Sequence, residues 1–408
     1  NALNALDKGI RYFQSLSVNG GYIDMYPADG KDNPKIKSEE KRIDVHFPGT
    51  SHTGYAFLVA YRTTGEQYYL SCAEEAADAL IDGQQEAGGW YYSIYKDKKA
   101  EYNYSTFDDD VTQYSLHLLM DLGTIIKKEP LQKAVTKGYN LILKSQSGNG
   151  GWPQAYPMRG DHRDFFTFKN NALNDCINVM IDAHKIFGKQ EYYDSLEKGS
   201  DFIILSQLPP PQSGWAQYYN HYLQPAWGQS FEPPSVCSSV TVRNIYSLID
   251  LYIRYGKEKY LEPVSDALRW LKESRLPNGK WARFYELGTN KPLYYERGRK
   301  RVGSIEELPT VQRSDYEYEM AIDLEEITGR YNEIKKLGRE KYLEKQNKPL
   351  SESEKLIKAG AMESNIQKII SSQDEIGRWV TGDAIETKVF ISNVNALCEY
   401  INLVKSIY

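Results

Sequence analysis

The sequence has little cysteine and no long apolar run, and these scarcities exclude several classes of protein. The four cysteines lack the C-x-x-C spacing of zinc and redox sites and are widely separated, at Cys72, Cys176, Cys237 and Cys398. We therefore expect buried free thiols. No stretch approaches the roughly 18 apolar residues of a membrane-spanning helix, so we expect no membrane span. The N-terminus also lacks the charged and then apolar pattern of a signal peptide.

An excess of basic charge is also missing. Lys and Arg number 50 against 55 Asp and Glu, which gives a formal net charge of −5 at pH 7. No overall positive field therefore draws the chain to nucleic acid or to an anionic membrane, and we expect neither as a partner. A polyanionic ligand would have to be bound by a local cluster of cations.

What the chain does contain is a sixfold repeat. Each copy runs from Gln, or Arg in one copy, through a glycine-containing turn to an aromatic residue. The copies are Gln14…Tyr22, Gln85…Trp90, Gln146…Trp152, Gln207…Trp215, Arg275…Trp281 and Gln373…Trp379. Successive aromatic residues lie 68, 62, 63, 66 and 98 residues apart. Such a period indicates stacked helical hairpins that bury their apolar faces against one another.

We therefore predict an all-α fold, an (α/α) toroid of up to six helical hairpins with irregular loops and a small hairpin at the rim. Residues 1–408 form a single domain in this prediction, and we expect a monomer. After the turns, apolar residues recur at the i, i+3, i+4, i+7 spacing of amphipathic helices. Residues 330–371 are highly charged, and we interpret them as a charged helical insertion.

Polar groups recur at the start of the helices that follow the turns. They are Asp108, Asp109 and Asp110, then Asn170 and Asn171, and then Arg243 slightly further into its helix. The 62 residues from 108 to 170 equal the interval from Trp90 to Trp152. Equal offsets within repeats imply equal heights in a ring, so we expect these groups to line one cavity.

Each of these groups has more than one interpretation. Three consecutive aspartates can cap a helix and favour its dipole, bind a cation such as Ca²⁺, or supply a catalytic acid. Asn170 and Asn171 can add oxygen ligands, bind sugar hydroxyls or cap a helix. Arg243 lies among apolar neighbours, which indicates either a polar cavity or a structural ion pair.

Arginines and aromatic residues gather in the loops. The cationic residues are Arg283, Arg297, Arg299, Lys300, Arg301 and Arg313. Forked guanidinium groups match carboxylates, which fits an acidic sugar, although most of the run from 297 to 301 reads as solvated charge. Tyrosines number 33 and tryptophans 7. Rings such as Trp152 and Tyr218 suit sugar faces, and equally suit packing at hairpin ends.

The stretches around these residues resemble the family 10 pectate lyases. The matching motifs are GGW at 88–90, STFDDDVT at 105–112, NGGWPQAYP at 149–157, TFKNNAL at 167–173, and WARFYE at 281–286 with TNKP at 289–292. The resemblance covers about residues 46–330. It implies β-elimination of a uronic-acid polymer of the pectate type, assisted by Ca²⁺, in a protein that is secreted, periplasmic or on the surface of a bacterium.

The resemblance also implies roles for individual residues. Asp108, with Asp109, would bind calcium or the substrate cation, and Arg243 would be the base that removes the C5 proton. Arg297 and Arg313 would bind uronate carboxylates. We add Asn170, Arg283, Trp152 and Tyr218 as substrate-binding candidates. Asn170 stands where the family usually has Asp, a departure that bears on calcium affinity.

Other functions remain open from the residues. The guanidinium pKa lies above about 12, so Tyr218, His221 or His162 could serve as the base instead. A glycoside hydrolase on the same fold would use two carboxylates from among Asp108, Asp109, Asp110 and Asp164. A non-catalytic glycan-binding protein is the third possibility. Acidic polysaccharides or oligosaccharides are the expected ligands for the lyase.

Overall fold

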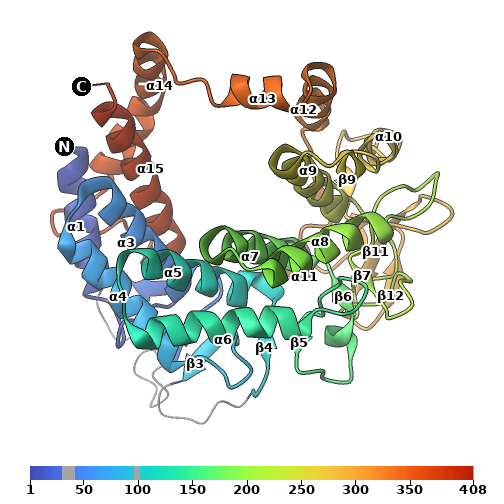
Figure 1. Cartoon of the computed structure of the whole chain (residues 1–408), viewed down its shortest axis with the longest axis horizontal. Helices are drawn as coiled ribbons and strands as arrows, with labels where there is room; N and C mark the ends of the chain where they lie inside the picture. Colours follow the sequence, from blue (N-terminus) through green and yellow to red (C-terminus); the bar gives the residue numbers. More distant parts are fainter. Residues whose placement is uncertain (30–41, 96–101, 408) are drawn as a thin grey trace. The chain divides into compact units, whose positions relative to one another are not determined.

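The computed structural model describes residues 1–29, 42–95 and 102–407. It contains two compact units, one formed by Asn1–Leu141 with Pro349–Tyr408 and the other by Ile142–Lys348. Most of the described chain is helical, and short strands connect the helices (Figure 1). No helix in the described ranges is long and apolar enough to cross a membrane. All four cysteines are buried and free, as expected. The single-domain arrangement stays a prediction.

In the first unit, helices before and after the turns alternate along the chain. The helices before a turn are α1 (Ala2–Gln14), α4 (Gln67–Asp82), α14 (Glu352–Ser371) and α6 (Glu129–Ser145), which continues into the second unit. The helices after a turn are α3 (Thr50–Thr64), α5 (Val111–Ile125) and α15 (Thr387–Lys405). Helix α3 contacts α4, α5 and α15, so the helices that follow the turns form one packed layer.

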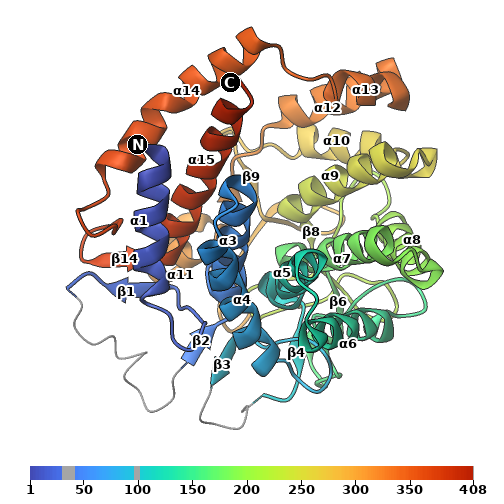
Figure 2. The same ribbon diagram turned by 60° about the vertical axis from the view of Figure 1, so that its left-hand side comes forward.

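The two ends of the chain pack together within this unit. Helix α1 lies against α14 and α15 (Figures 1 and 2). Strand β1 (Met25–Pro27) pairs antiparallel with β14 (Ala384–Glu386). The rings of Phe13 and Phe390 stack with centroids 3.9 Å apart. The first and sixth hairpins are therefore packed neighbours, although they lie at opposite ends of the sequence.

The second unit continues the same alternation. Helices α8 (Gln190–Leu205) and α10 (Val264–Glu273) precede turns, and α7 (Ala172–Phe187), α9 (Ser238–Tyr255) and α12 (Leu324–Leu337) follow them. Two further helices are α11 (Thr310–Asp315) and α13 (Arg339–Gln346). A four-stranded sheet has the order β12 (Lys300–Val302), β11 (Pro292–Glu296), β10 (Phe284–Tyr285), β8 (Val236–Cys237). The β11–β12 pair is the small hairpin that we predicted.

Shorter strand pairs accompany the turns. In the first unit β2 (Arg42–Asp44) pairs with β3 (Ser93–Tyr95). In the second unit β6 (Phe166–Thr167) pairs with β7 (Tyr218–Tyr219), and β9 (Trp281–Ala282) with β13 (Glu319–Met320). Strands β4 (Ser105–Thr106) and β5 (Ala155–Tyr156) are also two residues long. Each of these short strands leads towards a helix that follows a turn.

The tryptophans of five turns make the same hydrogen bond. Each indole is buried, and its Nε1 donates to a backbone carbonyl of the preceding helix over 2.6 to 2.9 Å. The residues are Trp90, Trp152, Trp215, Trp281 and Trp379. This shared bond confirms that the copies found in the sequence are structural equivalents.

The glutamine of the repeat ties each turn to the next hairpin. Gln146 Nε2 donates to Gly150 O (3.0 Å) within its turn and to Ser195 O (2.9 Å) in α8. In the second copy this role belongs to Gln84, which donates to Gly88 O (2.7 Å) and Ala134 O (2.8 Å). The sequence assignment of Gln85 was therefore wrong by one residue. Two adjacent glutamines fit the pattern equally well, and only their contacts separate them.

The charged stretch from 330 to 371 lies largely in helices, and part of it completes a hairpin of the repeat. Helix α14 buries Ala359, Ile366 and Ile369. It packs against α1 and α15 and leads into the sixth turn. The high charge therefore marks the solvent side of a helix in the repeat, and α12 and α13 precede it in the second unit.

The turn glycines allow each hairpin to approach the next one closely. Gly150 has φ +95°, and a Cβ built on it would lie 2.0 Å from Lys198 O in α8. We predict that Gly150→Ala lowers the free energy of unfolding by roughly 2–4 kcal/mol, because both the backbone strain and the clash must be relieved.

Urea denaturation of the variant measures this loss. The control is Gly148→Ala in the same turn, where a Cβ meets nothing within 4 Å. It should stay within about 0.5 kcal/mol of the wild type. Equal stability of the two variants would contradict the role of the close contact.

Candidate active site

The aspartate turn of the first unit holds Asp108 rigidly. Asp108 opens the 3₁₀ turn Asp108–Asp110 and is only 2% exposed. The hydroxyl of Tyr92 donates to its Oδ2 over 2.9 Å, and its backbone N–H donates to Thr106 Oγ1 over 3.1 Å. Asp109 is exposed, and Asp109 and Asp110 have φ values of 51° and 58°. Buried and open carboxylates therefore lie side by side on one turn.

Simple helix capping does not explain these aspartates. Asp110 occupies the N-cap position of α5, but its side chain makes no capping hydrogen bond. Burial raises the pKa of Asp110 to about 6, with a further contribution from the charge of Asp109 and an opposing one from His117. Burial and the charge of Asp108 raise the pKa of Tyr92, so its hydroxyl keeps the proton that it donates. The environment of the turn therefore disfavours the ionised forms of Asp110 and Tyr92.

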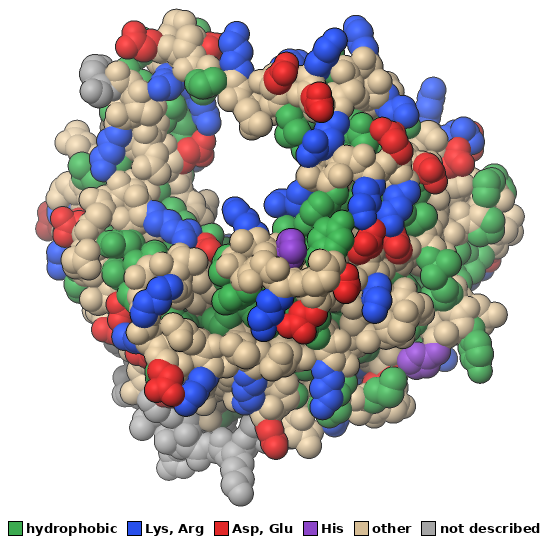
Figure 3. Space-filling view, viewed as in Figure 1, with side chains coloured by type: hydrophobic (Ala, Val, Ile, Leu, Met, Phe, Trp, Pro, Cys, Tyr) green, Lys and Arg blue, Asp and Glu red, His purple; other side chains and the backbone are tan. Residues whose placement is uncertain are grey.

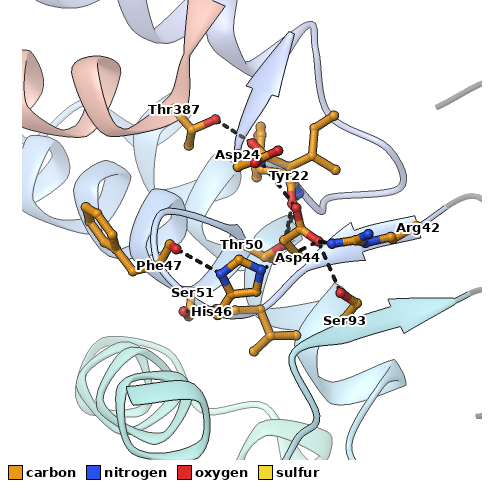
Figure 4. Close-up of polar contacts among 12 residues, drawn as sticks. Tyr22, Asp24, Arg42, Asp44, His46, Phe47, Thr50, Ser51, Ser93 and Thr387 are labelled. Carbon is orange, nitrogen blue, oxygen red and sulfur yellow. Dashed lines mark hydrogen bonds and ion pairs between the residues drawn. The ribbon is translucent and has the colours of Figure 1, made fainter. Parts of the chain in front are cut away.

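A buried polar cluster supports this turn from below. Asp44 is fully buried, and its Oδ1 accepts from Arg42 Nε and Nη2 (2.8 and 2.6 Å) and from Ser93 Oγ (3.1 Å) (Figure 4). The bond from Ser93 joins β2 to β3. The next residue, Val45, donates its backbone N–H to Tyr92 O over 2.9 Å. The cluster therefore positions the tyrosine that holds Asp108.

The corresponding turn of the second unit carries different side chains. The 3₁₀ turn Lys169–Asn171 repeats the geometry, because Lys169 N donates to Thr167 Oγ1 over 3.0 Å and Asn170 has a φ of 47°. Lys169 thus corresponds to Asp108, and Asn170 to Asp109. Our pairing of 108 with 170 by their spacing was wrong by one residue, because the stretch from Trp152 to its turn is one residue shorter than the stretch from Trp90 to Asp108.

A chain of amides connects this turn to α9. Asn171 Nδ2 donates to Asp175 Oδ1 over 2.6 Å. Asn174 Nδ2 donates to Asn171 Oδ1 (3.0 Å) and to Asn244 Oδ1 (2.9 Å). Asn171 makes no side-chain capping bond to α7, so capping does not account for it either. The bonds place the start of α7 beside the residue that follows Arg243.

Arg243 and Arg283 lie near the same face of α9. Arg283 Nη1 donates to Ser239 Oγ over 3.3 Å, and its guanidinium lies 4.5 Å from the ring centre of Tyr316. Ser239 and Arg243 are four residues apart on the helix and therefore share a face. The Arg243 side chain is exposed, and within the described ranges it has neither an ion pair nor a hydrogen bond. The structural ion pair that the sequence left open is not found there.

Sequence reasoning missed the buried carboxylate of Glu232. It is 1% exposed and accepts from Gln217 Nε2 (2.8 Å), Tyr316 OH (3.1 Å) and Gln229 N (2.8 Å). Lys169 Nζ lies 4.0 Å from its Oε1. The only signal in the sequence was a single acidic residue directly before two prolines in an aromatic loop. Glu232 anchors that loop against the turn of Lys169.

Arg297 and Arg313 are exposed, and one buried glutamine joins their segments. Gln312 Oε1 accepts from Arg297 N over 3.3 Å, and Gln312 Nε2 donates to Tyr295 O over 2.9 Å. The Arg297 guanidinium lies 5.7 Å from the ring centre of Phe231. The roles in substrate binding that we gave to Arg297 and Arg313 stay predictions.

Trp152 and Tyr218 are packing residues in this structure. Each is 1% exposed, and Tyr218 OH donates to Gln154 Oε1 over 3.1 Å. A ring buried on both faces has no surface for a sugar, so their inclusion as stacking residues is corrected. Tyr219 and Tyr285 donate to the carbonyls of Ser206 and Ser274, which cap the C-terminal ends of α8 and α10. Many of the abundant tyrosines therefore close hairpin ends.

The described residues contain no group of three or more His, Cys, Asp or Glu side chains that could hold a metal ion. The paired carboxylates of Asp108 and Asp109 are the nearest to such a set among the predicted residues. In the second unit the same turn offers the ammonium of Lys169 and the amide of Asn170. Any calcium ion would therefore rest mainly on the first turn.

Comparison with known families finds a match to part of the chain. Residues 93–278 match the model of the pectic acid lyase family. This confirms the resemblance seen in the sequence, over a shorter stretch than the expected 46–330. Asp108, Asn170 and Arg243 lie inside the matched stretch, whereas Arg283, Arg297 and Arg313 lie beyond it. No curated protein matches the chain.

Solved structures confirm the fold class. Two structures of the family 10 polysaccharide lyase from Cellvibrio cellulosa match with TM-scores of 0.55 and 0.54 at 19% and 20% identity. Both cover 71% of this chain, and 98% and 96% of their own chains. The first is a mutant in complex with trigalacturonic acid. A D-mannose isomerase matches with a TM-score of 0.51 at 14% identity, covering 72% of this chain and 76% of its own. The predicted (α/α)-toroid class is therefore confirmed, and such likeness shows the fold alone.

His52, beside the aspartate turn, gives a test of the electrostatics. Its ring stacks on Tyr114 with centroids 3.7 Å apart, and burial, aided by His46, lowers its pKa to about 3. The unfolded chain binds this proton near pH 6.5 and the folded chain does not, so stability falls as pH decreases. We predict that His52→Phe gains about 2–3 kcal/mol relative to the wild type between pH 7 and pH 4.5.

Urea denaturation at the two pH values measures this gain. His221→Gln is the control, because His221 is exposed. Its stability relative to the wild type should be the same at both pH values. A His52→Phe variant with the same acid sensitivity as the wild type would show that His52 is protonated in the folded state.

Proposed function

We propose that this chain is a polysaccharide lyase that cleaves a glycan containing uronic acid, of the pectate or polygalacturonate type, by β-elimination. The observation that carries the proposal is Arg243, an exposed guanidinium without an ion pair in the described ranges, on the helix face that Arg283 also contacts. It lies within the stretch that matches the pectic acid lyase family. Two guanidinium groups on one face suit a substrate that carries carboxylates.

The chemistry requires a cation and a base. Positive charge at the uronate carboxylate acidifies the hydrogen on C5. Arg243 in its neutral form would accept that proton, the electron pair would form the C4–C5 double bond, and the C4–O bond would break. The leaving oxygen then takes a proton. Arg283 would hold the carboxylate. We expect activity to rise at alkaline pH.

The carboxylates of Asp108 and Asp109 fit a calcium ion, which prefers oxygen ligands. When bound, calcium would supply positive charge that neutralises the uronate carboxylate. Asp108 already uses one oxygen for the Tyr92 hydroxyl, which orients the other. The exposed carboxylate of Asp109 would provide a second ligand, and Tyr92 would keep Asp108 in place.

One observation favours a second candidate, a glycoside hydrolase. The raised pKa of Asp110, about 6, and the exposed carboxylate of Asp109 beside it form a pair in which one group holds its proton more tightly. Such pairs can divide the roles of acid and base. The two functions differ in product, because only a lyase generates an unsaturated uronide that absorbs ultraviolet light.

The base is tested by Arg243→Lys, which keeps the charge but removes the fork. We predict a loss of at least about 100-fold in the rate of unsaturated product formation from polygalacturonate, because proton transfer in the transition state is lost. Binding of oligogalacturonate should change little.

Arg254→Lys is the matched control, an exposed arginine near the other end of the same helix. It should retain wild-type activity. An Arg243→Lys enzyme within tenfold of the wild type would remove Arg243 as the base. If the wild type forms reducing ends from polygalacturonate without ultraviolet absorbance, the hydrolase replaces the lyase.

Calcium binding has its own test. We predict that calcium raises the melting temperature of the wild type, because a ligand that binds only the folded state stabilises it. Asp108→Asn should abolish this shift and lower lyase activity. Asp201→Asn, which changes an aspartate of the second unit that pairs with Lys259, should keep the shift. An unchanged melting temperature in the wild type at millimolar calcium would rule out the ion at this turn.

A further inference from the structure

A cavity of about 690 Å³ lies in the second unit, apart from the face of Arg243 and Arg283. Three segments form it: the turn His162–Asp164, the loop after β7, and the turn between β11 and β12. Its lining includes His162, His221, Trp227 and Arg299. The volume falls within the range of small-molecule sites, about 300–1,000 Å³.

The walls of this cavity are held by hydrogen bonds. Asp164 accepts from the backbone N–H groups of Arg159 (2.6 Å) and Gly160 (2.7 Å). Asn220 Oδ1 accepts from Tyr222 N (2.9 Å) and Gln224 N (3.0 Å). A preformed site loses little conformational entropy when a ligand binds.

The third wall is a turn that brings in a cation. The backbone N–H of Arg299 donates to Ser230 O over 2.8 Å, and that of Gly298 donates to Ser230 Oγ over 2.9 Å. The turn is thereby fixed to the loop after β7. The Arg299 guanidinium lies 4.7 Å from the ring centre of Trp227. A guanidinium stacked on a ring keeps its N–H groups free at the edge.

The acidic residues that line the cavity are engaged by groups other than Arg299. Asp161 is engaged by Arg163, whose Nε and Nη2 donate to it, and this hydrogen bonding lowers the pKa of Asp161 to about 2. Asp164 is engaged by backbone N–H groups. In the described ranges Arg299 forms no ion pair, whereas the next residue, Lys300, pairs with Glu296 over 3.0 Å. The cavity therefore suits an anionic ligand.

The cavity also offers surfaces for a sugar ring. Trp227 lies in its wall, and His221 is exposed beside it. Tyr222, at the tip of the same loop, is 85% exposed. Rings with polar edges pack well on the apolar faces of pyranoses.

We propose that this cavity is a binding subsite for a uronate residue of an acidic glycan, with Arg299 holding the carboxylate. The subsite rests on the proposed lyase function for the identity of the glycan, and it extends that function by a residue that the sequence had placed in a solvated charge run. The cavity wall continues towards the turn of Lys169, because Gly228 in the wall donates its backbone N–H to Glu232 O over 3.1 Å, and Lys169 Nζ lies 4.0 Å from Glu232 Oε1. A chain bound near the turn of Lys169 can thus reach the cavity.

The test is Arg299→Asn, measured by calorimetry with trigalacturonate in the Arg243→Lys background. Asn tolerates the left-handed backbone of this position, φ +65°, so folding is preserved while the charge is lost. We expect trigalacturonate to bind at least about tenfold more weakly, the loss expected for one charge-assisted bidentate pair. In the otherwise wild-type enzyme, KM for polygalacturonate should rise with little change in kcat.

Lys300→Gln is the matched control, a cation of the same hairpin that is paired outside the cavity. It should bind trigalacturonate within twofold of its parent. Galactotriose, which lacks carboxylates, should not distinguish Arg299→Asn from its parent. If Arg299→Asn and Lys300→Gln weaken binding equally, the effect comes from the loss of any positive charge on the hairpin, and the subsite is overturned.

The outcomes separate the subsite from the lyase. If polygalacturonate is cleaved to unsaturated product and Arg299→Asn binds trigalacturonate normally, the subsite is wrong and the lyase stands. If Arg299→Asn weakens binding but no unsaturated product forms, the subsite stands and the lyase is wrong. If the protein binds no trigalacturonate at all, the subsite is overturned.

Discussion

The contact between each turn and the helix of the next hairpin is the constraint on which the rest of the structure depends. A single hairpin leaves one apolar face exposed, so it is stable only when its neighbour covers that face. At Gly150 the backbone of the turn lies against α8, and Gly20, Gly88 and Gly377 make the same kind of contact with α4, α6 and α1. A glutamine such as Gln146 then joins the turn to the next hairpin, because its side-chain amide donates hydrogen bonds to a carbonyl group of each.

The contact between a turn and the next hairpin also fixes the position of the candidate site residues that follow the turn. The Trp after each turn is fixed by its indole hydrogen bond, and the chain then runs through a short strand to the helix that follows. The turn at the start of that helix therefore has the same position in each repeat. Asp108 begins this turn in the first unit, and Lys169 begins it in the second. Charge of both signs is interspersed on the visible surface (Figure 3). The repeats differ in the side chains that follow each turn, and we expect these side chains to determine which ligand is bound.

The sequence predicted the fold well, because each residue type of the repeat has the same structural role in the copies where it recurs. Glycine with positive φ, the buried Trp and the bridging Gln all recur at a readable spacing. It predicted the register less well: Gln85 was chosen for Gln84, and Asp108 was paired with Asn170 in place of Lys169. A period of about 62 residues tolerates a one-residue change in a loop, and only hydrogen bonds reveal it. Glu232 was not predicted, because its role depends on its burial and its hydrogen-bond partners. Neither can be read from a single glutamate in the sequence.

The two equivalent turns carry different side chains on the same backbone geometry. In both turns a backbone N–H donates to a threonine hydroxyl oxygen and the next residue is left-handed, so the backbone is nearly constant. One presents the carboxylates of Asp108 and Asp109, and the other the ammonium of Lys169 and the amide of Asn170. In the proposed lyase, the carboxylate turn would bind the substrate's anion through a cation, whereas an ammonium at the same place would contact it directly. Exchange of a few side chains at one place in the repeat can therefore replace a bound metal by a fixed charge without altering the fold.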